Sequence, residues 1–235
     1  MAIKKSELLG FISRYSLGGN VESVKWETSV DSVVTNFVST DKTLKGTISG
    51  TIQGIKDNNN FGIFETSQLV RMLSIMTEDL NVDTSSTSLM FRDKYTDFSY
   101  VLADLDVIPK VPSLKLTPSF TSTIKIDDNF IARFVKSYGA LPDSDFFTIE
   151  SDVIGRKLTF GHSNTNSNRI SFDIETEDDI QIIHFSANLV REILIANKGT
   201  VGTLEISPVG LAKIKFNNAL YKSEYLLVNK QIDGE

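Results

Sequence analysis

Apolar residues recur three or four positions apart in four segments of the chain, a spacing that predicts four amphipathic helices. The first helix is expected to begin near Ser6, because serine is a favoured residue at helix N-termini. The other three are predicted over Thr66–Met76, Asp127–Tyr138 and Ser186–Asn197. Each segment has one apolar and one polar face, so each helix is expected to cover a core with one side only.

Most of the remaining chain alternates apolar and polar residues or runs in β-branched and aromatic residues, which predicts β-strands. TLKGTISGTIQGI, NRISFDIET, IQIIHF and EYLLV are examples. Turn-forming residues such as Gly18-Gly19 and Ser207-Pro208-Val209-Gly210 separate the strands. The pattern predicts an α+β fold with antiparallel sheets.

The two halves of the chain repeat the same pattern. Phe91 and Tyr100 stand nine residues apart and precede Val-Leu-Ala-Asp, while Phe216 and Tyr225 stand nine apart and precede Leu-Leu-Val-Asn. Each half also has one Leu-Val-Arg motif in its second predicted helix, and the openings SELLGFISRY and DNFIARFVKSY match. Three matched segments in the same order predict two similar β-rich domains, each with two helices.

Three of the five prolines lie close together near the middle of the chain, at Pro109, Pro112 and Pro118. Proline has no backbone N–H and disfavours helix in the residue before it, so this stretch is expected to be extended. We therefore predict a first domain over residues 1–106, a connector over 107–119 and a second domain over 120–235.

The composition excludes several classes of site. The 235 residues include no Cys, which excludes disulfides, Cys-ligated metals and a thiol nucleophile. The only histidines are His162, in a polar turn, and His184, in a predicted strand, and both are interpreted as structural. Trp26 is expected in the core, and the acidic run Glu175–Asp179 in a solvated hairpin. We therefore expect no catalytic residue, no bound metal and no cofactor.

No apolar run approaches the roughly 18 residues that a membrane-spanning helix needs, and the N-terminus lacks the apolar core of a signal peptide. We expect a soluble protein of the cytoplasm, with no membrane partner.

Charge is distributed unevenly along the chain. The chain has a formal net charge of −6, but the four helical segments, taken with Lys4, Lys5 and Lys198, hold 8 basic and 4 acidic residues. The rest therefore has a net charge of −10. Each helix places one arginine on its polar face. These faces could be ordinary solvated surfaces, or together they could form one surface that meets phosphates.

Four segments, taken in order, resemble the DNA sliding clamps of the proliferating cell nuclear antigen class. YVLADLDVIPKVP is similar to the end of the first clamp domain and its connector, and FSANLVREILIAN to the last inner helix with its preceding strand. ISPVGLAKIKF is similar to a turn and strand of the second domain, and YLLVNKQIDGE to the clamp C-terminus. The chain is most like the clamps of tailed phages of the T-even type. Asn229 departs from the proline that cellular members often have there, so the phage or cellular assignment stays open.

The resemblance implies a two-domain subunit that closes into a homotrimeric ring around double-stranded DNA. The ring tethers a DNA polymerase, is opened and closed by an ATP-dependent clamp loader, and has no enzymatic activity of its own. Its helices line the hole. The residues expected to face DNA are Arg14, Arg71, Arg133, Lys136, Arg191 and Lys198.

Clamps of this class also bind short partner peptides beside the connector and the C-terminus. The corresponding residues here are Val107, Ile108, Pro109, Pro112, Leu114, Val228 and Ile232. The connector residues among them are too apolar for a simple solvated linker. The alternative is that they pack onto the two domains and cover their seam.

Other function classes remain open from sequence alone. One is an enzyme with a carboxylate-only active site, such as a glycosidase. Another is a monomeric processivity factor or a β-sandwich protein of a virion. A monomeric factor is expected to have a strongly basic outer face, which the charge of −10 outside the helices opposes. The native mass separates a ring from a monomer.

Overall fold

The structure is a computed structural model that describes residues 2–55, 58–113, 118–151, 155–161, 168–176 and 180–231. The chain divides into two compact units. The first unit comprises Met1–Pro112 and Asn218–Ser223, and the second comprises Ser113–Asn217 and Glu224–Glu235. The domain boundaries that we derived from the sequence stay a prediction.

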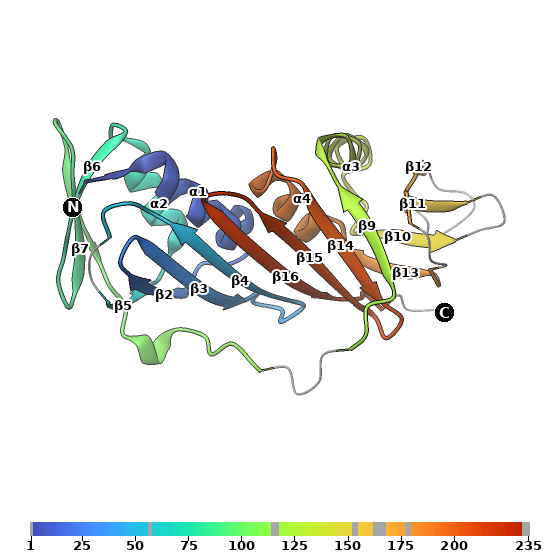
Figure 1. Cartoon of the computed structure of the whole chain (residues 1–235), viewed down its shortest axis with the longest axis horizontal. Coiled ribbons are helices and arrows are strands. Elements are labelled where there is room, and N and C mark those ends of the chain that lie inside the picture. Colours follow the sequence, from blue (N-terminus) through green and yellow to red (C-terminus); the bar gives the residue numbers. More distant parts are fainter. Residues whose placement is uncertain are drawn as a thin grey trace. The chain divides into compact units, whose positions relative to one another are not determined.

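The first unit has two antiparallel sheets and two helices (Figure 1). One sheet has the strand order β5-β2-β3-β4, formed by β2 (Val24–Ser29), β3 (Ser32–Val38), β4 (Leu44–Thr51) and β5 (Asn60–Ile63). The other has the order β1-β6-β7-β8, formed by β1 (Ala2–Lys4), β6 (Asp79–Thr84), β7 (Ser88–Arg92) and β8 (Asp97–Val101). The helices are α1 (Lys5–Ser16) and α2 (Thr66–Ser74), with 3-10 turns at Leu17–Gly19 and Leu105–Val107.

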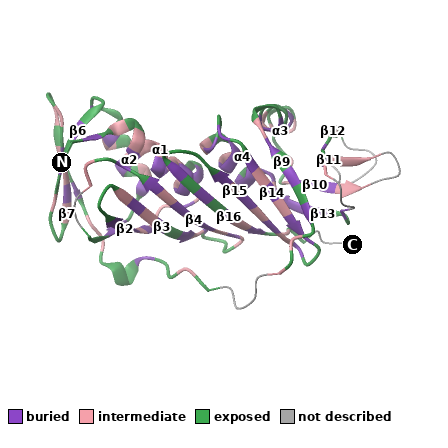
Figure 2. Ribbon diagram, in the orientation of Figure 1, coloured by how far each residue is buried: buried purple, intermediate pink, exposed green. Residues whose placement is uncertain are grey.

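The sheet β5-β2-β3-β4 has more residues than the sheet β1-β6-β7-β8, so the two are called the larger and the smaller sheet. Alternation along the strands places one face of the larger sheet in the core, as the banded colouring of β3 and β4 illustrates (Figure 2). The fully buried rings of Phe11 and Tyr15 on α1 pack edge-on against Trp26 of β2. Gly46 allows close packing, because a Cβ atom there would overlap the ring of Phe37. Trp26 itself is buried, so the prediction that it is a core residue is confirmed.

The second unit repeats this arrangement of two antiparallel sheets and two helices. One sheet contains β9 (Ser122–Ile126), β14 (Gly202–Ser207) and β15 (Leu211–Asn217), with β14 paired to both neighbours. The other has the order β12-β11-β10-β13, formed by β10 (Phe146–Ser151), β11 (Arg156–Phe160), β12 (Ile170–Asp173) and β13 (Ile183–Ser186). The helices are α3 (Asp128–Ala140) and α4 (Ala187–Ala196), and β16 (Tyr221–Val228) begins in the first unit and ends in the second.

The α+β fold with two helices and antiparallel sheets in each half is thus confirmed. Two of the helices begin at the expected caps. The Asp127 side chain accepts from the Phe130 N–H at 2.8 Å, and the Ser186 hydroxyl accepts from the Leu189 N–H at 3.4 Å. The bond from Phe130 lowers the pKa of Asp127.

Ser6 is not the N-cap of α1, contrary to the sequence prediction. The cap is Lys4, whose side chain makes no capping hydrogen bond. The carboxylate of Glu78 takes the place of a capping side chain. It accepts from the Ser6 N–H at 3.2 Å and from the Ser6 hydroxyl. These bonds lower the pKa of Glu78. A residue 72 positions away thus supplies the cap, which local sequence rules do not detect.

The turn between β7 and β8 is held by Asp93, whose carboxylate accepts from the N–H groups of Thr77, Tyr95 and Thr96 at 2.6, 2.7 and 2.7 Å. These bonds lower the pKa of Asp93 to about 2. The stabilisation is therefore present above the unfolded-state pKa of about 3.9 and is lost as the pH falls through about 2. We expect a carboxyl ¹³C titration of the folded protein to give a pKa near 2 for this residue. An ordinary value near 3.9 would show that the three bonds do not hold in solution.

None of the helices in the part of the chain that the structure describes combines the length and apolar character needed to cross a membrane.

Candidate nucleic-acid interface and partner pocket

Exposed basic residues lie on α3 and just beyond the end of α4. Arg133 and Lys136 are exposed on α3, opposite the buried rings of Phe130 and Phe134. Lys198 is exposed just beyond the end of α4. The second unit therefore presents two exposed cations on α3 and one in the turn after α4, and none of the three contributes to its core.

Two arginines of this unit are oriented by neighbouring groups. Arg133 donates to the backbone oxygen of Asp173 at 3.4 Å, and its guanidinium lies 5.0 Å from the ring of Phe172 in β12. Arg191, which is half-buried, forms an ion pair with Glu192 and lies 5.4 Å from the ring of Tyr138. Because Glu192 offsets its charge, Arg191 adds little net positive potential to the surface.

In the first unit, Arg71 is the residue predicted to face DNA that is exposed. It lies on α2, opposite the buried side chains of Leu69 and Leu73.

Arg14 does not face solvent. The expectation that it lies on an exposed, DNA-facing surface is therefore wrong. The residue is 7% exposed, its Nη1 donates to the Gly10 carbonyl at 2.6 Å, and its guanidinium lies 4.0 Å from the centre of the Tyr221 ring. The Tyr221 hydroxyl in turn donates to the backbone oxygen of Glu7 at 2.8 Å. Tyr221 comes from β16 and covers the polar face of α1, so Arg14 stabilises the first unit instead of contributing to an interface.

The connector is partly exposed and partly packed. Val107 is 60% exposed and Pro109 and Pro112 are exposed, whereas Ile108 is 7% exposed. The Pro112 carbonyl accepts from the Lys45 ammonium at 2.8 Å, which ties this end of the connector to β4. Ile108 therefore belongs to the core of the first unit, as the packing alternative expected, and it is not an open groove wall.

The other residues predicted for this groove give less information. Val228 is exposed at the end of β16, in the second unit. Leu114 and Ile232 lie outside the described residues. A groove that joins the connector to Val228 stays a prediction.

The second unit contains a pocket of about 490 Å³ that the sequence did not predict. Its walls are the start of β9, the turn 207–210 between β14 and β15, the segment Ile180–Ile183 and Asn229. Two aliphatic side chains in its lining are largely exposed, Ile182 at 55% and Val209 at 71%. Exposed branched aliphatic residues beside a concave surface are typical of sites that bind another chain.

The apolar run Ile180-Gln181-Ile182-Ile183 lines this pocket, although its sequence pattern predicts a β-strand. We predicted a strand through the whole run, but β13 begins only at Ile183. Ile180 and Ile182 precede the strand. Ile180 is held at the end of β10, where its carbonyl accepts from the Ser151 N–H at 3.0 Å and its N–H donates to the Ser151 hydroxyl at 2.8 Å. The apolar run is thus visible in the sequence, whereas the exposure of Ile182 between the buried Ile180 and Ile183 is not.

The remaining candidates have structural roles. His184 is buried, and its Nδ1 lies 2.8 Å from the Thr148 hydroxyl, as expected for a structural histidine. His162 and most of the acidic run Glu175–Asp179 lie outside the described residues. Within the described ranges, no group of three or more His, Asp or Glu residues is arranged to hold a metal ion.

Comparisons with known proteins give matches in structure alone. No protein-family model and no curated protein matches the sequence. A structure of proliferating cell nuclear antigen from A. fulgidus bound to the C-terminal region of FEN-1 matches with a TM-score of 0.76 and 15% identity, covering 100% of this chain and 98% of that one. The Entamoeba histolytica antigen matches with a TM-score of 0.75, 12% identity and 98% coverage of both chains.

A structure of the PCNA2–PCNA3 complex from Sulfolobus tokodaii matches with a TM-score of 0.73 and 13% identity, covering 98% of this chain and 99% of that one. Identities this low establish the fold and leave the question of a phage or cellular type open. Over essentially its whole length, the chain has the fold of the proliferating cell nuclear antigen class of sliding clamps, as the sequence resemblance indicated.

Proposed function

We propose that this protein is a DNA sliding clamp, a processivity factor without enzymatic activity that tethers a DNA polymerase to double-stranded DNA. In this proposal, three copies form a ring in the cytoplasm of a bacterial or infected cell, and an ATP-dependent loader opens it. The observation that carries the proposal is the match to clamp structures over the full length of both chains. Fold likeness alone is an analogy, so the helical faces provide the second line of support.

The DNA-facing surface in this proposal consists of Arg71, Arg133, Lys136 and Lys198, which are all exposed. Arg191 has a lesser role because of its pairing with Glu192. Few cations on each subunit suit a sliding contact, because phosphate contacts carry no sequence information and weak ones can be broken and remade along the duplex. Arg14 is not part of this surface.

Ring closure is proposed to use the outer strands β8 and β12, each of which ends the order of its own sheet. An outer strand presents unpaired backbone groups to another chain. Pairing β8 of one subunit with β12 of the next would be head-to-tail and could close into a ring.

The native mass tests this assembly. We expect about 78 kDa at micromolar concentration, three times the 26.1 kDa chain. A mass of about 26 kDa under those conditions would favour the monomeric processivity factor.

Partner proteins are proposed to bind through a short segment that enters the pocket of the second unit. The A. fulgidus antigen is bound by the C-terminal region of another protein, FEN-1, which is the kind of partner segment we expect here. Ile182 and Val209 would contact an apolar side chain of that segment.

Replacing Ile182 and Val209 together by alanine is expected to weaken the binding of such segments at least fivefold, or about 1 kcal/mol. The measurement is a titration with fluorescent C-terminal peptides of DNA polymerases. Val201→Ala is the matched control, because Val201 is 62% exposed in the same unit and does not line the pocket. Equal affinities for the double variant and the parent would place the partner site elsewhere.

A further inference from the structure

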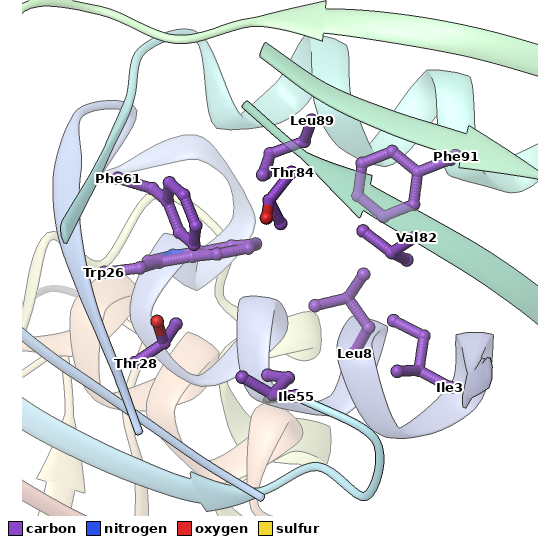
Figure 3. A pocket seen from close by; sticks show the side chains of 10 residues that line it. All are labelled: Ile3, Leu8, Trp26, Thr28, Ile55, Phe61, Val82, Thr84, Leu89 and Phe91. Atoms are coloured by element: carbon purple, nitrogen blue, oxygen red, sulfur yellow. The ribbon is translucent and has the colours of Figure 1, made fainter. Parts of the chain in front are cut away.

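A small cavity lies between the two sheets of the first unit, beside Trp26 (Figure 3). Its volume is about 40 Å³. Trp26 and Phe61 border it from the larger sheet, and Val82 and Phe91 border it from the smaller one. The remaining lining residues come from β1, α1, β2, β6, β7 and the segment after β4, and are Ile3, Leu8, Thr28, Ile55, Thr84 and Leu89.

The chemistry of the wall excludes stably bound water. The accessible wall is entirely apolar, although two threonines are among the lining residues. One of these, Thr28, uses its hydroxyl to donate to the Asn59 carbonyl at 3.1 Å. A single water needs about 10–15 Å³ and two to four polar partners, so this cavity has the space for water but lacks the partners. The cavity is therefore apolar and offers an ordered water too few polar partners.

The sequence explains why the space is unfilled. Thr28 lies near the end of β2 and Thr84 at the end of β6, so small side chains stand where the larger sheet and the smaller sheet approach each other. Ile55 and Thr84 are half-buried, whereas the other eight lining residues are buried. The cavity is thus nearest to solvent beside Ile55 and beside Thr84, and a small molecule could enter at either residue.

We propose that this cavity is a binding site for small apolar molecules, of the size of xenon or a short alkane. The volume of 40 Å³ is well below the roughly 150 Å³ of an apolar cavity that accepts benzene, so an aromatic ring is not expected to fit. An occupant would restore dispersion contacts that the lining side chains lack. Because it binds the folded state only, it stabilises the fold of the first unit.

The experiment uses xenon under pressure as the probe, with nitrogen at the same pressure as the control gas. Trp26 is the only tryptophan in the chain and borders the cavity, so its fluorescence reports occupancy directly. We expect xenon to quench Trp26 emission in a saturable manner and to raise the melting temperature by one to a few degrees.

The matched variants are Val82→Ile, which adds one methylene to the cavity wall, and Val30→Ile, which makes the same change at a position that is 68% exposed. Val82→Ile is expected to abolish both xenon effects, and Val30→Ile to retain them. Thr84→Ile, two residues further along the same face of β6, fills the space should Val82→Ile fail to fold. Absence of saturable quenching in the parent, or an undiminished response in a folded filling variant, would overturn the proposal.

Discussion

Replacing Lys136 and Lys198 together by alanine is expected to shorten the lifetime of the loaded protein on DNA and to reduce processive synthesis, with the fold intact. Both side chains are exposed on or beside α3 and α4, and neither contributes to the core. These lysines are a cleaner choice than Arg133, whose guanidinium also contacts Asp173 and Phe172 of β12. If each lysine meets one phosphate, the slope of log affinity against log salt should become shallower by about 0.9 for each phosphate that is no longer neutralised.

The control for this variant is Lys125→Ala with Lys222→Ala, which removes the same charge from exposed strand positions on β9 and β16. The control should retain the salt slope and the processivity of the parent. If both double variants lose salt slope and processivity equally, net charge alone matters. The helical faces would then not be the DNA-facing surface.

Replacing Ser99 by proline is expected to weaken the assembly of the proposed ring. The Leu102 N–H donates to Thr87 beside β7, and alternate residues of an antiparallel strand point the same way, so the N–H groups of residues 98 and 100 also face β7. The N–H of Ser99 therefore points away from the sheet, to the edge proposed to pair with the next subunit. Proline removes this donor and places its ring at the interface.

We expect the assembly constant of Ser99→Pro to fall at least tenfold, since the removal of a hydrogen bond worth about 1 kcal/mol adds to the steric conflict. Ser99→Ala, which keeps the N–H, should assemble like the parent. Analytical ultracentrifugation over a concentration series measures both variants, and circular dichroism verifies their fold. Trimers of unchanged stability in a folded Ser99→Pro protein would exclude this edge as the interface.

The local parts of the fold were predictable from the sequence because they depend on neighbouring residues. Helical spacing located all four helices to within a few residues, and Asp127 and Ser186 cap their helices as expected. The cap of α1 was missed because Glu78, far along the chain, supplies it.

The candidate interface shows the same limit. Helical spacing placed Lys136 and Arg71 correctly on exposed faces, because no element among the described residues covers those faces. It failed for Arg14, because the ring of Tyr221 from the last strand covers that part of α1. The pocket near Ile182 was missed for a similar reason, since its walls come from four separated segments of the second unit.

Retention on circular and linear DNA tests the central claim most directly. After loading onto a nicked circular duplex, the labelled protein should remain bound at a salt concentration that disrupts simple electrostatic binding. Cutting that circle once with a restriction enzyme should release the protein within the time needed to slide off the new ends. Retention that is equal on circular and linearised DNA, or dissociation from both at raised salt, would contradict a ring that encircles the duplex.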